Sequence, residues 1–62
     1  MTATIDYAQG RFLVSVYRDG RRIEYRHGGY RDVIAFAVGM GVPRGEVRLT
    51  PAAQGAAMGA VR

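Results

Sequence analysis

The dipeptide Asp19-Gly20 stands between two runs of alternating apolar and polar residues, 11–18 and 21–27. Both central residues of a tight type I′ turn adopt positive φ, which aspartate and glycine tolerate better than most residues. Asp-Gly between two alternating runs is therefore among the strongest short signals for a β-hairpin. We expect residues 11–27 to form two antiparallel strands around which the rest of the domain is organised.

A two-residue loop at Asp19-Gly20 also predicts how the two strands pair. The expected cross-strand pairs are Arg18 with Arg21, Val16 with Ile23, Val14 with Tyr25, and Phe12 with His27. The opposite face would then carry Leu13, Ser15, Tyr17, Arg22, Glu24 and Arg26. Because a slip of one residue would place charged side chains beside the valines, the apolar pattern favours this register.

Residues 2–8 alternate in the same way, and Gln9-Gly10 suits a second tight turn. This turn would place Ala3, Ile5 and Tyr7 opposite Val16, Val14 and Phe12. Two separately predicted turns thus give one continuous apolar face across three strands. Such agreement between local and long-range signals is typical of a foldable pattern.

Residues 30–40 change to the helical period and present a broad apolar arc with a thin polar side. Asp32 falls in the first turn, where a negative charge suits the helix dipole. Gly41 can provide the left-handed stop, and Pro43 prevents continuation. The arc is wider than one sheet face requires, so it is expected to be covered by a partner or by the C-terminal segment.

After the helix, residues 46–50 alternate again and predict a short fourth strand, with no indication of the sheet edge it joins. Thr50-Pro51 suits a helix start, with threonine as the N-cap. The following segment is rich in alanine but contains Gly55 and Gly59, each of which costs about 1 kcal/mol inside a helix. Residues 51–62 are therefore expected to be a weak helix or a disordered tail, and the glycines favour the tail.

These signals predict a single small α+β domain over residues 1–50, followed by the 51–62 segment. The expected order is βββαβ: a three-stranded antiparallel meander, one helix packed on one face, and the short fourth strand. The expected core consists of Ile5, Tyr7, Phe12, Val14, Val16, Ile23, Tyr25, Val33, Phe36, Ala37, Met40, Val47 and Leu49.

Sixty-two residues bury too little surface for high stability, so a domain of this size often depends on an oligomer or a larger partner. The chain has no cysteine, which excludes disulfides and thiolate metal sites. No apolar run approaches the length of a membrane span, and the N-terminus lacks the pattern of a signal peptide. We therefore expect a cytoplasmic protein without membrane contact.

The residues offer no set that would support catalysis. His27 is the only histidine, and it is expected at the edge of the core, across from Phe12. The carboxylates are scattered, and His27 has no companions at metal-ligand spacing. We expect no catalytic residues, no metal and no cofactor, and thus a protein that is not an enzyme.

The formal net charge of +4 comes from nine arginines and no lysine against five carboxylates. This balance suits nucleic acid or an acidic protein surface, although a GC-rich gene also explains many arginines and alanines. The candidate partner-binding residues are Tyr17, Arg18, Arg21, Arg22 and Arg26. Arginine and tyrosine are frequent hot-spot residues of protein interfaces, and both also suit RNA.

Two features of the expected hairpin face favour a protein partner. Glu24 would stand in its centre and repel phosphates, and Tyr17 would be its only aromatic residue, whereas single-strand platforms usually have two or more. The sequence therefore predicts a small binding module or inhibitor that docks on a larger protein or nucleoprotein assembly, and its size and arginine bias suit a phage or mobile-element inhibitor. Direct RNA or DNA binding through the same arginines is the alternative, and a homodimer is the third.

Overall fold

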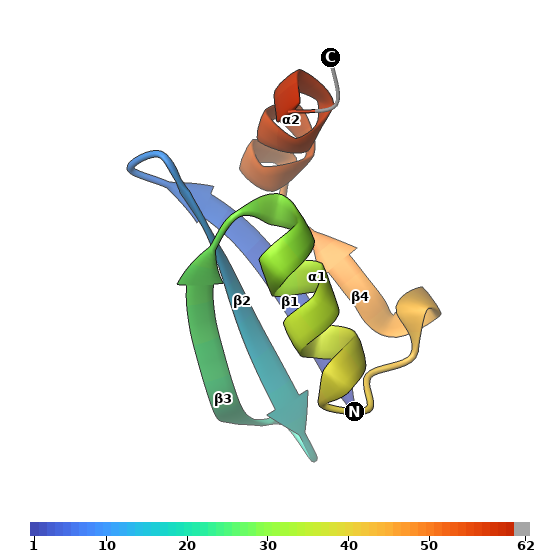
Figure 1. Ribbon diagram of the computed structural model, residues 1–62. Coiled ribbons are helices and arrows are strands. Elements are labelled where there is room, and N and C mark those ends of the chain that lie inside the picture. The colour runs from blue at the N-terminus through green and yellow to red at the C-terminus, as the bar shows by residue number, and fades with distance from the viewer. Residues whose placement is uncertain (61–62) are drawn as a thin grey trace.

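The computed structural model describes residues 1–60 of the chain, which form a two-layer α+β domain (Figure 1). The expected βββαβ order is confirmed, with a second helix added. The elements are β1 (Thr2–Ala8), β2 (Arg11–Arg18), β3 (Arg21–Gly28), α1 (Tyr30–Gly39), the 3-10 turn η1 (Arg44–Glu46), β4 (Val47–Leu49) and α2 (Pro51–Ala60).

Both predicted hairpin turns are confirmed by their backbone angles. Gln9 and Gly10 have φ of 54° and 78°, and Asp19 and Gly20 have φ of 52° and 77°. Positive φ at both central residues is the signature of the type I′ turn, whose twist matches that of the flanking strands.

The four strands form one sheet in the order β3-β2-β1-β4, with β4 parallel to β1. The predicted pairing of the first two strands is confirmed, with Ala3 opposite Val16 and Ile5 opposite Val14. The fourth strand joins the β1 edge, a choice that the sequence left open. There Val47 lies opposite Ala3, on the apolar side of the sheet.

The predicted register of β2 and β3 is wrong beyond the turn. Tyr17 pairs with Arg22 as a two-residue loop requires, but Val16 pairs with Glu24, which leaves Ile23 as one extra residue in β3. Such a β-bulge moves every later side chain of the strand to the opposite face. The pairs that result are Ser15 with Tyr25, Val14 with Arg26, Leu13 with His27, and Phe12 with Gly28.

The bulge suits the way β3 leads into α1. Gly28, rather than the predicted His27, lies opposite Phe12, and a Cβ atom at Gly28 would be in van der Waals contact with the Cβ of Asp32 in the first turn of α1, at 3.4 Å. The guanidinium carbon of Arg26 lies 4.7 Å from the ring centroid of Phe36. The side chain of Arg26 thus packs on α1, where Tyr25 was expected to do so.

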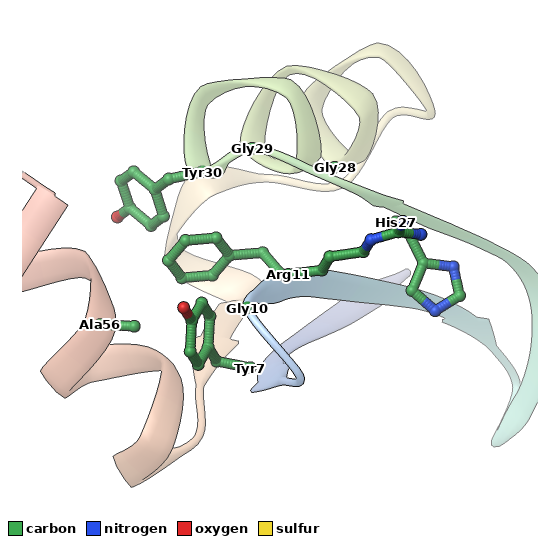
Figure 2. A pocket seen from close by; sticks show the side chains of 9 residues that line it. Tyr7, Gly10, Arg11, His27, Gly28, Gly29, Tyr30 and Ala56 are labelled. Carbon is green, nitrogen blue, oxygen red and sulfur yellow. The ribbon is translucent and has the colours of Figure 1, made fainter.

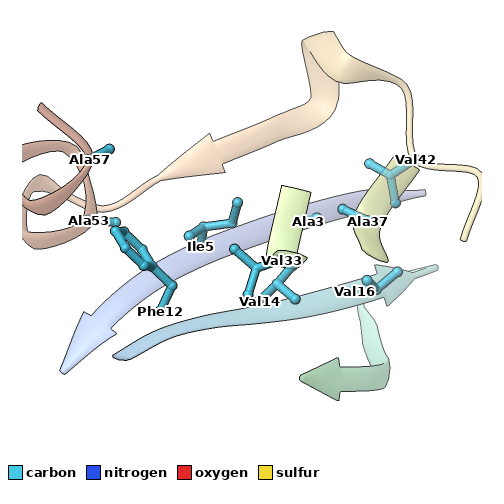
Figure 3. Packing of buried hydrophobic residues seen from close by; sticks show 10 residues of the cluster. All are labelled: Ala3, Ile5, Phe12, Val14, Val16, Val33, Ala37, Val42, Ala53 and Ala57. Atoms are coloured by element: carbon cyan, nitrogen blue, oxygen red, sulfur yellow. The ribbon is translucent and has the colours of Figure 1, made fainter. Parts of the chain in front are cut away.

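The core lies between the sheet and both helices (Figure 3). Ten buried hydrophobic residues form it: Ala3, Ile5, Phe12, Val14, Val16, Val33, Ala37, Val42, Ala53 and Ala57. Of the other predicted core residues, Tyr7, Phe36, Met40, Val47 and Leu49 are partly buried against this cluster. Ile23 and Tyr25 are 41% and 54% exposed, so their assignment to the core was wrong.

Helix α1 begins after Gly29 and ends at Gly39, and Gly41, with φ of 95°, provides the predicted left-handed stop beyond it. The Gly41 N–H donates to the carbonyl of Val38 at 3.0 Å, and the Val42 N–H donates to the carbonyl of Ala37 at 3.1 Å. This pair of bonds is the Schellman ending of a helix. It turns the chain so that the side chain of Val42 enters the core.

Residues 51–60 form helix α2. Of the two expected states, the structure has the helix, and the preference for a disordered tail was wrong for these residues. Residues 61–62 lie outside the described part of the chain. Thr50 caps the helix as predicted, because its Oγ1 accepts a hydrogen bond from the Ala53 N–H at 3.2 Å. Ala53 and Ala57 lie one turn apart and are both buried in the core. Their burial offsets the cost of the two glycines.

No helix of residues 1–60 combines the length and the apolar character needed to cross a bilayer.

The register of β3 predicts unequal effects for two matched substitutions. Ile5→Ala removes a fully buried side chain and should lower the free energy of unfolding by about 2–5 kcal/mol. Ile23→Ala alters an exposed bulge residue and should change it by about 1 kcal/mol or less. Chemical denaturation followed by circular dichroism measures both values. Equal losses would contradict the bulge and restore the direct register.

The helical state of the C-terminal segment predicts a stabilising substitution. A Cβ atom added at Gly55 meets no atom within 4 Å, so Gly55→Ala should raise the free energy of unfolding by about 1 kcal/mol. Gly41→Ala is the matched control: it also meets open space, but φ of 95° makes alanine unfavourable, so stability should fall by about 1 kcal/mol. An unchanged Gly55→Ala variant would mean that the segment is not helical in solution.

Candidate functional site

Both helices pack on the same side of the sheet, which leaves the other side uncovered by any described element (Figure 1). We call this uncovered side the open face. The pairing and alternation of the strands assign to it Thr2, Thr4, Asp6 and Ala8 of β1, Arg11, Leu13, Ser15 and Tyr17 of β2, Arg22, Tyr25 and His27 of β3, and Arg48 of β4.

The structure places two of the five predicted partner-binding residues together on the open face, while Arg18 and Arg21 alternate to its other side beside the turn. Tyr17 and Arg22 lie directly opposite each other on the open face, and Arg18 and Arg21 form the pair next to the turn. Arg26 is separated from them, because the bulge places it opposite Val14, on the side that α1 covers. Its expected place beside Tyr17 and Arg22 was therefore wrong.

The same bulge brings two aromatic rings to the open face that were expected on the buried side. The guanidinium carbon of Arg22 lies 4.9 Å from the ring centroid of Tyr25, within the range of a cation–π contact. The rings of Tyr25 and His27 are 6.2 Å apart and nearly perpendicular, at 89°. Arg22, Tyr25 and His27 thus form a continuous row along β3, with His27 exposed rather than at the edge of the core.

Arg11 and Arg48 add two further guanidinium groups to the open face. Arg11 begins β2 and alternates with the buried Phe12, while Arg48 lies opposite Thr4 on the neighbouring strand. Neither was predicted to belong to the site. The alternation that assigned Tyr17 to this face would have assigned Arg11 to it as well, whereas Arg48 required knowledge of the edge that β4 joins.

Negative charge is sparse on the open face. Among residues 1–60, Asp6 is the only strand carboxylate there, since Glu24 is opposite Val16 on the helix-covered side. The Thr50 hydroxyl donates a hydrogen bond to Asp6 Oδ1 at 2.8 Å, and the Tyr7 N–H donates to the same oxygen at 2.8 Å. These two bonds hold the pKa of Asp6 below its ordinary value of 3.8. Asp6 is thus a charged group tied to the start of α2.

Two hollows flank the end of the sheet near the Gln9-Gly10 turn. The first lies on the open face and is lined by Asp6, Ala8, Gln9, Arg11, Leu13 and His27. The second lies between the start of α1 and α2 and is lined by Tyr7, Phe12, Tyr30 and Ala56 among others. Arg11 extends from it toward His27 (Figure 2). The ring centroids of Phe12 lie 4.8 Å from Tyr7 and 5.3 Å from Tyr30, so this cluster closes the end of the core.

An apolar groove runs between α1 and β4, on the helix-covered side of the domain. Tyr30, Ile34, Val38, Val47 and Leu49 line it, with Arg31 and Arg44 among its other residues. Val38 is 40% exposed, so the broad apolar arc of the helix is not fully covered by α2. Within residues 1–60, no three histidine, aspartate or glutamate side chains gather into a group that could hold a metal ion.

Comparison with protein-family models, with curated proteins and with solved structures found no match to this chain.

The bonds at Asp6 predict a pH dependence of stability. Because the pKa of Asp6 is lowered by folding, its contribution is present above the unfolded pKa of about 4 and is lost as the pH falls through the lower folded pKa. Thr50→Val removes the hydroxyl bond, so this acid dependence should shrink, and loss of the N-cap should cost about 1 kcal/mol at every pH.

Thr50→Ser keeps a hydroxyl and is the matched control, which should retain both effects. Denaturant midpoints measured from neutral pH down into the acid range give the comparison. An acid dependence that is the same in Thr50→Val and Thr50→Ser would contradict the bond between Thr50 and Asp6.

Proposed function

We propose that this chain is a small, cytoplasmic, non-enzymatic protein that binds nucleic acid through the open face of its sheet. The observation that carries the proposal is the bulge in β3, which places Tyr25 and His27 beside Arg22 and moves Glu24 to the opposite side. Both features that favoured a protein partner at this face depended on the direct register. With the bulge, neither the central carboxylate nor the lone aromatic residue remains.

The distribution of charge supports the same proposal. Arg11, Arg22 and Arg48 project from three different strands of the open face, and Arg18 and Arg21 flank its turn. A planar guanidinium can donate two parallel hydrogen bonds to a phosphate, and it is more weakly hydrated than the ammonium group of lysine. Arginines spread over an uncovered sheet therefore suit a surface that follows a nucleic-acid backbone.

Docking on a larger protein or nucleoprotein assembly is the second candidate function, and the groove between α1 and β4 favours it. The groove combines apolar side chains, among them Val38 and Leu49, with the guanidinium groups of Arg31 and Arg44. This chemistry fits an apolar segment of a partner protein that carries acidic residues at its flanks. The groove lies on the helix-covered side of the sheet, so it leaves the open face free for nucleic acid.

Nucleic-acid binding by the open face predicts a charge-specific loss of affinity. The triple variant Arg11→Gln, Arg22→Gln, Arg48→Gln should bind mixed-sequence oligonucleotides more weakly, and the slope of log K against log salt should flatten by about one for each phosphate that the protein no longer neutralises. The double variant Arg31→Gln, Arg44→Gln lowers the charge at the groove instead and should keep the wild-type slope. Fluorescence anisotropy over a range of salt concentrations measures both.

Absence of any binding to oligonucleotides at low salt would refute the proposal. Sedimentation that shows a self-associated species would then favour the groove between α1 and β4 as a binding surface. This requires that the Val38→Glu variant sediments as a monomer. That outcome would identify a second copy of the chain as the occupant of the groove.

A further inference from the structure

We propose that the nucleic acid bound is duplex DNA and that Arg22, held against the ring of Tyr25, contacts the base edges in its major groove. This inference rests on the nucleic-acid binding proposed above and adds to it the kind of nucleic acid and the residue that contacts the bases. Three observations support it: the aromatic rings of the open face contact one another and Arg22, the ring of Tyr25 restrains the side chain of Arg22, and the dimensions of the β2–β3 hairpin fit the groove.

The aromatic rings of the open face are poorly placed to stack on unpaired bases. The guanidinium of Arg22 lies over the ring of Tyr25, and the ring of His27 stands nearly perpendicular to it. Tyr17 is half-buried. Proteins that bind single strands need ring faces on which successive bases can stack. The rings here are engaged with one another and with Arg22, which disfavours a single-stranded ligand.

The same contact prepares Arg22 for a different kind of recognition. A guanidinium that stacks on an aromatic ring keeps the donors at its edge free for hydrogen bonds. Arginine that donates two bonds to O6 and N7 of guanine is the commonest specific contact in the major groove. Because the ring of Tyr25 restrains the side chain before binding, less conformational freedom is lost when those bonds form.

The dimensions of this end of the sheet fit the major groove of B-DNA. Neighbouring strands lie about 4.8 Å apart, and the major groove, about 12 Å wide, admits a two-stranded ribbon such as the β2–β3 hairpin that carries Arg22. The turn between β2 and β3 lies at the end of the domain away from α2, and Arg18 and Arg21 flank it (Figure 1). The end of the sheet at which Arg22 lies is thus clear of α2. Duplex RNA has a deep, narrow major groove that side chains cannot read.

The first part of the test compares three probes under the same salt conditions. Fluorescence anisotropy measures binding to a mixed-sequence DNA duplex, to one of its single strands, and to an RNA duplex of the same sequence. The DNA duplex should bind at least about tenfold more tightly than either of the others. Equal or tighter binding of the single strand or the RNA would overturn this inference and leave the proposed function standing. No binding to any probe would overturn both.

The second part uses two arginines of the same strand that stack on aromatic rings on opposite sides of the sheet. Arg22→Lys keeps the charge but loses the planar fork, so affinity for the DNA duplex should fall by about tenfold. Arg26→Lys makes the same change over Phe36, on the helix-covered side, and should leave the affinity unchanged. Tyr25→Phe should bind like the wild type, whereas Tyr25→Leu should lose as much affinity as Arg22→Lys.

Circular dichroism and denaturation confirm that each variant is folded before binding is compared. Equal losses in Arg22→Lys and Arg26→Lys, or no loss in Arg22→Lys, would overturn the assignment of Arg22. Wild-type affinity in Tyr25→Leu would overturn the role of the ring.

Discussion

One extra residue in β3, at Ile23, determines which side chains the sheet buries and which it exposes. Side chains of a strand alternate between its two faces, so a bulge exchanges the faces for every residue that follows. Arg26 thereby covers Phe36, and Tyr25 joins Arg22 on the open face. The core and the candidate site are thus two consequences of the same local irregularity.

One side of the sheet carries the hydrophobic core, and the other side is the open face. Valine and isoleucine of the two central strands pack against α1, and alanines of α2 close the remaining space, so small side chains suffice to complete the core. No described element covers the other side, where guanidinium groups, three aromatic rings and a single strand carboxylate are exposed to different degrees. A domain with one such side can retain its fold while the residues of the open face are altered, because they lie outside the main hydrophobic cluster.

Much of the fold could be predicted from the sequence, because its signals are local. Both tight turns, the pairing of the first two strands, and the helix that is stopped by Gly41 follow from short-range patterns. The bulge could not be predicted this way, because residues 22–27 alternate regularly in either register. Which side of β3 meets the helix is decided by long-range contacts such as that of Arg26 with Phe36. The choice between helix and tail for residues 51–60 could not be made for a similar reason, because the alanines of α2 gain stability through packing against distant residues.

For the candidate site, the placement of Tyr17 beside Arg22 on one face was predicted correctly, while the bulge removed Arg26 from that face and added two rings of β3. The most direct measurement of the central claim is the set of cross-strand nuclear Overhauser effects between β2 and β3. The bulged register predicts contacts that join Ser15 to Tyr25 and Leu13 to His27. Backbone contacts that place Val14 directly opposite Tyr25, and Phe12 opposite His27, would contradict the account.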